Sequence, residues 1–144
     1  MDGLGSRDRE WLPYKYYTDP PHHSFHEFCR GPVLPWARIK YFGDLCFRKD
    51  TVEEIHALSP DWWIAPLKAR DRKGLRDAFI KTSEVDPVRD ECEAYGSKLV
   101  TGGNKVTIKR YLGSPHLFAF YPWLAQKEFD RDSIEALREA HCTR

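Results

Sequence analysis

An acidic residue and a histidine stand where they could act together on a hydroxyl group. Asp86 precedes Pro87 in the segment SEVDPVRDECEAYGSKL, and His116 follows in the motif GSPH. An imidazole can take the proton of a hydroxyl nucleophile, and a carboxylate can hold that imidazole in the required tautomer and stabilise its charged form. The two residues are therefore interpreted as members of a catalytic triad, with Asp86 orienting His116, the general base.

Each of these residues follows a predicted strand. The compact apolar run at residues 78–80 predicts a buried strand whose carboxyl end delivers Asp86. The segment KVTIKRY, residues 105–111, alternates apolar and polar side chains and predicts a second strand, which leads into the loop that holds His116. In open α/β sheets, ligands bind beyond the carboxyl ends of strands. The positions of Asp86 and His116 agree with that rule.

A helix is predicted between the two strands, over residues 87–101. Asp86 and Pro87 suit its N-cap and first position, and Gly102 and Gly103 are expected to end it in the left-handed conformation. Its buried stripe is expected to contain Val88, Cys92, Tyr95 and Leu99. The alternation of strand and helix predicts the α/β class with a parallel sheet.

The remaining segments predict shorter elements. Residues 11–17, WLPYKYY, favour a short strand, and residues 18–32, with three prolines and three histidines, favour a surface loop. Residues 36–47 have helical apolar spacing. The spacing of Thr51 and Glu54 is typical of a capping box at the start of a short helix over residues 51–58.

The same capping-box spacing recurs near the C-terminus. Asp132 and Glu135 have it, ahead of an amphipathic helix over residues 133–141. Ile134 and Leu137 are expected to face the core of the protein.

The composition excludes several classes of protein. With 144 residues, 41% of them hydrophobic, the chain can build one domain with a core. A formal net charge of +1 disfavours nucleic acid as a partner. The four cysteines form no Cys-x-x-Cys pair and favour reduced thiols in a cytoplasmic protein. The longest apolar run, residues 116–125, is too short to span a membrane, the first fifteen residues lack the apolar core of a secretory signal, and no cofactor is expected.

Several motifs together resemble one family. They are GL at 74–75, EVDPVRDE at 84–91, AY at 94–95, RY at 110–111 and PHLF at 115–118. Upstream, GPVLPWARIKYFGDLCF resembles an aromatic cap helix that borders an acyl pocket, and SPDWWIAPL resembles the segment after it. Over residues 12–125 the chain resembles the hormone-sensitive-lipase-like, arylacetamide-deacetylase-like branch of the α/β hydrolases. It departs from the family pattern at Leu117, where a glycine is usual, and at Arg76 and Asp77, where two prolines are common.

The resemblance implies a C-terminal portion of an α/β hydrolase, with about three parallel strands, flanking helices and part of a helical cap. Residues 1–11 would be an irregular N-terminus, and residues 12–144 a partial hydrolase domain in which 18–75 include a cap-like insertion. The chain order of Asp86 before His116 matches that of α/β hydrolases. The activity implied is hydrolysis of carboxylic esters with apolar, uncharged acyl groups.

The nucleophile is the residue that the sequence does not supply in the expected form. A nucleophile elbow needs Gly-x-Ser-x-Gly, because small residues let the strand turn sharply into a helix. None of the seven serines has these neighbours, and there is no His-Gly-Gly run for an oxyanion hole. We therefore expect a C-terminal half that is inactive alone, with an open strand edge that favours self-association or pairing with a missing N-terminal half.

Alternative interpretations exist for each motif. Asp86 before Pro87 is a good helix N-cap in any fold, and a histidine in a loop is usually a polar surface group. The histidines of the 18–32 loop, His22, His23 and His26, suggest a metal site, but a loop interpretation is favoured because two prolines precede them and a zinc motif needs a helix. Arg89, Asp90 and Glu93 suggest a solvated helix face.

The apolar side chains near the predicted site have two interpretations. As pocket residues they would bind the acyl group, and the set comprises Trp36, Tyr41, Phe42, Leu117 and Phe118. As core residues they would only pack the cap onto the body, which is the usual role of aromatics at helical spacing. The competing class is a non-catalytic protein, either an inactive hydrolase from a truncated reading frame or a binding or interaction module that keeps the apolar pocket. Loss of ester turnover in His116→Ala would distinguish an enzyme from these.

Overall fold

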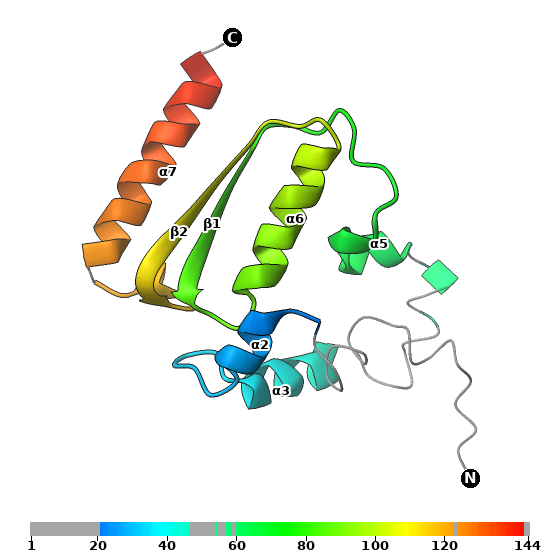
Figure 1. Cartoon of the computed structure of the whole chain (residues 1–144), viewed down its shortest axis with the longest axis vertical. Coiled ribbons are helices and arrows are strands. Elements are labelled where there is room, and N and C mark those ends of the chain that lie inside the picture. The colour runs from blue at the N-terminus through cyan, green and yellow to red at the C-terminus, as the bar shows by residue number, and fades with distance from the viewer. Residues whose placement is uncertain (1–20, 47–53, 55–56, 59, 123, 143–144) are drawn as a thin grey trace.

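The computed structural model describes residues 21–46, 54, 57–58, 60–122 and 124–142 (Figure 1). At its centre two parallel strands, β1 (Ala78–Val85) and β2 (Val106–Pro115), are joined by helix α6 (Arg89–Thr101). This unit confirms the predicted strand, helix and strand. The third expected strand, at 11–17, lies outside the described residues. So does most of the predicted helix at 51–58, of which Glu54, Ala57 and Leu58 are helical.

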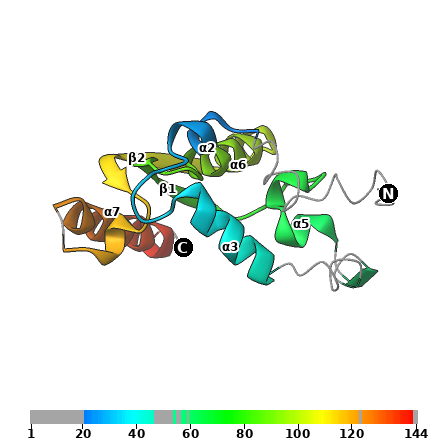
Figure 2. The same cartoon turned by 90° about the horizontal axis from the view of Figure 1, so that it is seen from below.

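Helices α6 and α7 (Leu124–Cys142) cover opposite faces of the sheet (Figure 2). Successive strand residues point to opposite faces, so Ile80 and Ile108 lie under α6. A Cβ at Gly96 of α6 would lie 2.6 Å from Ile108 Cδ1 and 3.0 Å from Ile80 Cδ1. Glycine at this position therefore lets the helix approach the sheet closely.

Helix α6 begins two residues later than predicted, at Arg89. Leu99 of the predicted stripe is buried, and Val88, Cys92 and Tyr95 are partly buried. Only one of the two terminal glycines is left-handed: Gly103 has φ +83°, whereas Gly102 has φ −75°. Gly102 is required for a different reason, because a Cβ there would lie 2.9 Å from the Arg72 carbonyl oxygen.

The C-terminal helix corrects two predictions. It begins at Leu124, so Asp132 lies inside the helix and is not its cap. Asp132 faces the sheet and is buried, while Ile134 and Leu137, expected to face the core, are 49% and 60% exposed. The reason is that Phe129, Asp132 and Ser133 form the stripe that contacts β1 and β2.

The segment before the sheet forms short helices: α2 (His23–Glu27), α3 (Trp36–Cys46), α5 (Asp61–Ile64) and the 3₁₀ turn η1 (Pro66–Lys68). Helix α3 confirms the helix predicted at 36–47. The surface loop predicted at 18–32 is wrong at α2, where the chain is helical and Ser24 and Phe25 are buried. Phe25 packs edge-on against Trp36, with ring centroids 5.6 Å apart, which brings α2 into the core.

An aromatic cluster supports the loop after β2. Phe118, at the start of the 3₁₀ turn η2 (Phe118–Phe120), lies 4.9 Å from Tyr111 of β2 and 5.6 Å from Phe129 of α7 between ring centroids. Phe118 and Tyr111 are both buried. The cluster therefore joins β2, its following loop and α7. Within the described ranges, none of the helices is long and apolar enough to cross a lipid bilayer.

Candidate active site

Asp86 lies at the carboxyl end of β1, in the turn that leads into α6. The Val88 N–H donates to Asp86 Oδ1 at 3.0 Å, and the Arg89 N–H donates to the Asp86 carbonyl at 3.2 Å. Asp86 is buried, and the Pro87 side chain is fully buried. The carboxylate thus holds the helix entry with one oxygen, as an N-cap does, and keeps its other oxygen available.

His116 follows β2 directly and lies beside Asp86. Its Nδ1 is 2.8 Å from Asp86 Oδ2, and its side chain is about a quarter exposed. With Asp86 ionised, Nδ1 must carry the proton of that hydrogen bond, which leaves Nε2 as the basic nitrogen. The arrangement can take a proton from a hydroxyl group presented to Nε2.

The residue after His116 takes an unusual backbone conformation. Leu117 has φ 59° and ψ 17°, the left-handed region in which a Cβ is unfavourable. The glycine that is usual at this position would adopt it without strain. The loop therefore keeps a glycine-like geometry despite the substitution.

The residues predicted to bind an acyl group lie in two places. Tyr41 and Phe42 are exposed on α3, and Trp36 is half-buried against Phe25. Leu117 is exposed next to His116, whereas Phe118 is buried in the aromatic cluster. A role in substrate binding stays a prediction for all five predicted residues.

The histidines of the 18–32 segment lie on α2 and its N-cap. His22 is the N-cap, and His23 Nδ1 is 3.5 Å from Glu27 of the same helix. Within the described residues, no group of three His, Cys, Asp or Glu side chains is placed to hold a metal ion.

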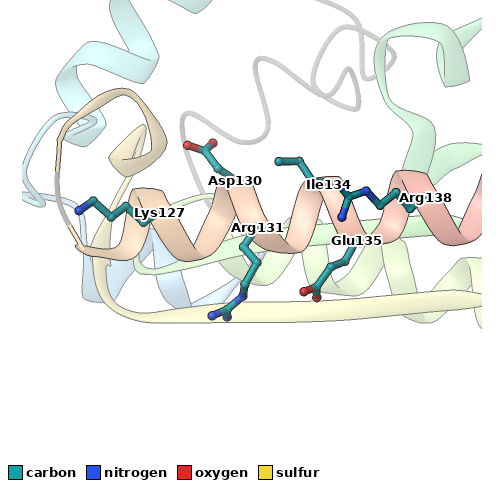
Figure 3. A pocket seen from close by; sticks show the side chains of 6 residues that line it. All are labelled: Lys127, Asp130, Arg131, Ile134, Glu135 and Arg138. Carbon is teal, nitrogen blue, oxygen red and sulfur yellow. The ribbon is translucent and has the colours of Figure 1, made fainter.

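Two serine hydroxyls in the segments around Asp86 and His116 donate hydrogen bonds to backbone carbonyls. Ser114 is buried and donates to the Leu112 carbonyl at 3.4 Å, and Ser24 donates to the Pro87 carbonyl at 2.7 Å. Both hydroxyls therefore point to backbone carbonyls and not to the His116 ring. A depression on the surface is lined only by residues of α7 and includes neither Asp86 nor His116 (Figure 3).

The prediction of a solvated face for Arg89, Asp90 and Glu93 is wrong. The Arg89 side chain is only 11% exposed and donates to Asp90 at 2.7 Å. Burial disfavours the charged form of Arg89 and by itself would lower its pKa. Hydrogen bonds to Asp90 and Glu27 have the larger effect, so the pKa of Arg89 is raised. Arg110 of β2 holds both oxygens of Glu93, and its hydrogen bonds are the main reason that the pKa of Glu93 is lowered.

The sequence also gives no indication of the role of Ser24, which fastens α2 to the turn that contains Asp86. Its N–H donates to Asp90 Oδ2 at 2.8 Å, and its hydroxyl accepts from the Asp90 N–H at 3.2 Å. Burial raises the pKa of Asp90, but hydrogen bonds from Arg89 and Ser24 lower it by more. A serine in a polar, proline-flanked segment gave no signal for a contact 66 residues away.

A charged cluster fills the face between the sheet and α7. Lys81 and Lys109 are register partners, and Lys109 contacts Asp132 at 2.5 Å and Glu128 at 2.7 Å. Lys81 donates to the Phe129 carbonyl at 2.9 Å and to the Ser133 hydroxyl. Burial lowers the pKa of Lys81, and its hydrogen bonds to the Phe129 carbonyl and the Ser133 hydroxyl join β1 to α7, so we assign it a structural role.

Comparison with known proteins identifies the family to which the sequence is similar. Residues 11–120 match the model described as the alpha/beta hydrolase fold. The chain is 38% identical over 58 residues to an arylesterase of Saccharolobus solfataricus, covering 40% of this chain and 19% of the relative. It is 34% identical over 87 residues to the carboxylic ester hydrolase LipN of Mycobacterium tuberculosis, covering 60% and 22%.

A solved structure is similar over most of the chain. The hyperthermophilic esterase from Pyrobaculum calidifontis has a TM-score of 0.68 and 32% identity, covering 89% of this chain and 41% of that one. The chain spans about a fifth of the length of the arylesterase and of LipN, 19% and 22%. Because the family model matches most of the residues, this chain belongs to the alpha/beta hydrolase family.

Proposed function

We propose that this chain carries the acid-base part of a serine carboxylic ester hydrolase of the hormone-sensitive-lipase-like, arylacetamide-deacetylase-like branch. The observation that carries the proposal is the 2.8 Å contact between His116 Nδ1 and Asp86 Oδ2 at the carboxyl ends of two neighbouring parallel strands. The names of the similar proteins, an arylesterase and a carboxylic ester hydrolase, support ester hydrolysis as the reaction.

In this mechanism His116 handles the protons and Asp86 fixes the ring. His116 Nε2 takes the proton of a serine hydroxyl while the serine oxygen attacks the acyl carbon, and then gives that proton to the leaving alcohol. In the second half, Nε2 takes a proton from water, whose oxygen attacks the acyl-enzyme, and then returns that proton to the serine oxygen as the acyl–serine bond breaks and the acid leaves. Asp86 stabilises the imidazolium formed in each half and is not itself protonated.

The nucleophile and the oxyanion hole would come from another polypeptide segment. No serine of the chain stands in Gly-x-Ser-x-Gly, and the solved esterase is more than twice as long as the part that this chain covers. A two-stranded sheet has little stability by itself. We therefore propose pairing with a segment that supplies further parallel strands and the serine elbow.

The proposed substrate is an ester with an apolar, uncharged acyl group. Leu117 supports this best, because it is exposed directly beside His116. Tyr41 and Phe42, exposed on α3, are proposed as a further part of the acyl wall. The four free cysteines agree with a cytoplasmic location, which is part of the same proposal.

The test is hydrolysis of p-nitrophenyl butyrate by the purified chain, alone and co-expressed with the part of the Pyrobaculum calidifontis esterase that the chain does not cover. We expect turnover only in the co-expressed pair. His116→Ala should lower kcat by at least about 100-fold, because a general base contributes roughly that much. His141→Ala, an exposed histidine at the end of α7, is the matched control and should leave kcat unchanged.

A non-catalytic module that binds apolar ligands is the second candidate, and the lack of a Gly-x-Ser-x-Gly serine in this sequence favours it. This candidate predicts that the chain binds a long-chain ester but does not hydrolyse it, either alone or when co-expressed with the esterase segment. Turnover that survives in His116→Ala would contradict the hydrolase proposal, since the pair would then have no part in the reaction.

A further inference from the structure

The two strands lose their regular register just before the catalytic residues. Ser83 is paired with Tyr111, but the next pair is Val85 with Pro115. One residue of β1, Glu84, therefore faces three residues of β2, numbered 112–114. Such an irregularity takes backbone groups out of the ladder and bends the strand. It ends one residue before His116, so its geometry decides where the histidine ring is placed.

The Glu84 carboxylate accepts a hydrogen bond from the backbone of the irregular segment. Its Oε2 accepts the Gly113 N–H at 2.6 Å, a short hydrogen bond of the charge-assisted kind. Gly113 has φ +65°, a conformation that glycine adopts without strain, and no atom lies within 4 Å of a Cβ built there. Glycine is thus needed for the backbone turn, and the Glu84 carboxylate is the group that holds the turn in place.

The backbone of Glu84 is held from the other side. Its carbonyl accepts from Arg89 Nη1 at 2.9 Å, and the same guanidinium contacts Asp90 and Glu27. Arg89 is nearly buried, and the Ser24 hydroxyl joins Asp90 to the Pro87 carbonyl. The turn that contains Asp86 is therefore held by several hydrogen bonds, and Glu84 connects this turn to the segment of β2 that leads to His116.

From these contacts we propose that Glu84 is a positioning residue for the reaction, which sets the place of His116 relative to Asp86 by holding the Gly113 N–H. Glu84 bonds the Gly113 N–H, not the His116 ring, and acts through the backbone of residues 113–116. This inference rests on the proposed function. Without the carboxylate the irregular segment would keep its length but lose its anchor, and the 2.8 Å contact would no longer be enforced. A displacement of about 1 Å costs roughly 100-fold in rate.

The first experiment uses this chain with ¹⁵N-labelled histidine and glycine. The proton between His116 Nδ1 and Asp86 should give a low-field NMR resonance that Asp86→Asn removes. We expect Glu84→Ala to remove or broaden this resonance and to speed exchange of the Gly113 amide. Asp77→Ala, an exposed acid just before the start of β1, is the matched control and should change neither signal.

Glu84→Gln keeps a hydrogen-bond acceptor for the Gly113 N–H but removes the negative charge. It is the second variant to measure in case Glu84→Ala does not fold. It should keep the resonance while the Gly113 amide exchanges roughly five-fold faster, because a neutral acceptor forms a weaker hydrogen bond. An unchanged Gly113 exchange rate in folded Glu84→Gln would overturn the proposal. In the co-expressed hydrolase, Glu84→Ala should lower kcat about 100-fold with KM nearly unchanged, and Glu84→Gln should restore most of the rate.

The outcomes separate the two proposals. If the wild-type chain shows no resonance that Asp86→Asn removes, the Asp86–His116 pair is wrong and the positioning role falls with it. If the wild type shows the resonance and a folded Glu84→Ala keeps it with normal kcat, only the role of Glu84 is refuted.

Discussion

The aromatic cluster under the histidine loop makes a quantitative prediction, because η2 contains two phenylalanines in opposite environments. Phe118 is 4% exposed and Phe120 is 80% exposed, two residues apart in the same 3₁₀ turn. Truncating a buried phenylalanine costs about 3–5 kcal/mol, the sum of lost transfer free energy and the cavity left behind. Truncating an exposed one changes stability by about 0.5 kcal/mol or less.

Phe118→Ala is therefore expected to lower the free energy of unfolding by about 3–5 kcal/mol, which is a large part of the about 5–15 kcal/mol of a typical domain. The melting temperature should fall by about 10 °C or more. Phe120→Ala should stay close to the wild type. The assay is urea unfolding followed by circular dichroism, with thermal melting of the same samples.

If Phe118→Ala does not fold, Phe118→Leu can replace it in the comparison. This smaller truncation should leave a measurable unfolding transition, at a lower urea concentration and temperature than that of the wild type. Equal transitions in the Phe118 and Phe120 variants would refute the assignment of Phe118 to the core. A stable Phe118→Ala variant with weakened ester binding would instead favour its role in the acyl pocket.

Three further predictions concern single side chains. Hydrogen bonds from Lys109 and Tyr111 hold the pKa of Asp132 at about 2, below its usual 3.8. The ionised carboxylate therefore stabilises the folded state above pH 3.8, and this stabilisation is lost as the pH falls toward 2. In Asp132→Asn the free energy of unfolding should fall less steeply with pH over this range. Burial raises the pKa of the Cys92 thiol to about 11, so in a Cys92-only variant the thiol should react with a disulfide reagent at pH 8 much more slowly than an exposed cysteine, and equal rates would contradict its burial. Leu117→Gly should raise the unfolding free energy by up to about 1 kcal/mol, measured by urea unfolding, because glycine removes left-handed strain; a loss of stability would mean that Leu117 packing outweighs the strain.

The sequence predicts the central unit well, because its signals are local. The compact apolar run of β1, the alternation in β2 and the stripe of α6 are local patterns, and the structure has a strand, a strand and a helix at these places. Asp86 and His116 are predicted from their places after recognisable strands and from the family resemblance of their motifs. Their contact then follows from the parallel pairing of the two strands.

The errors lie where long-range contacts override local patterns. Asp132 has the spacing of a cap, but the helix begins at Leu124, and Asp132 is buried by its contacts with Lys109 and Tyr111 of β2. Ser24 lies in a segment with loop composition, and its burial depends on Asp90, which is distant in the sequence. Glu84 has no periodic signal at all, because its role depends on a register irregularity that only the paired strands reveal.

The Asp86–His116 pair is a property of one strand–helix–strand unit. Neighbouring parallel strands end at the same edge of the sheet, and there Asp86 contacts His116 directly, with one Asp86 oxygen also held by the Val88 N–H. A serine elbow needs a further strand at that edge, and no serine of this sequence has the flanking glycines that the elbow requires. Assembly of the proton-transfer pair and assembly of the complete triad should therefore be separable events. The low-field resonance of His116 is expected in the chain alone, while ester turnover is expected only after a segment with the serine joins the sheet.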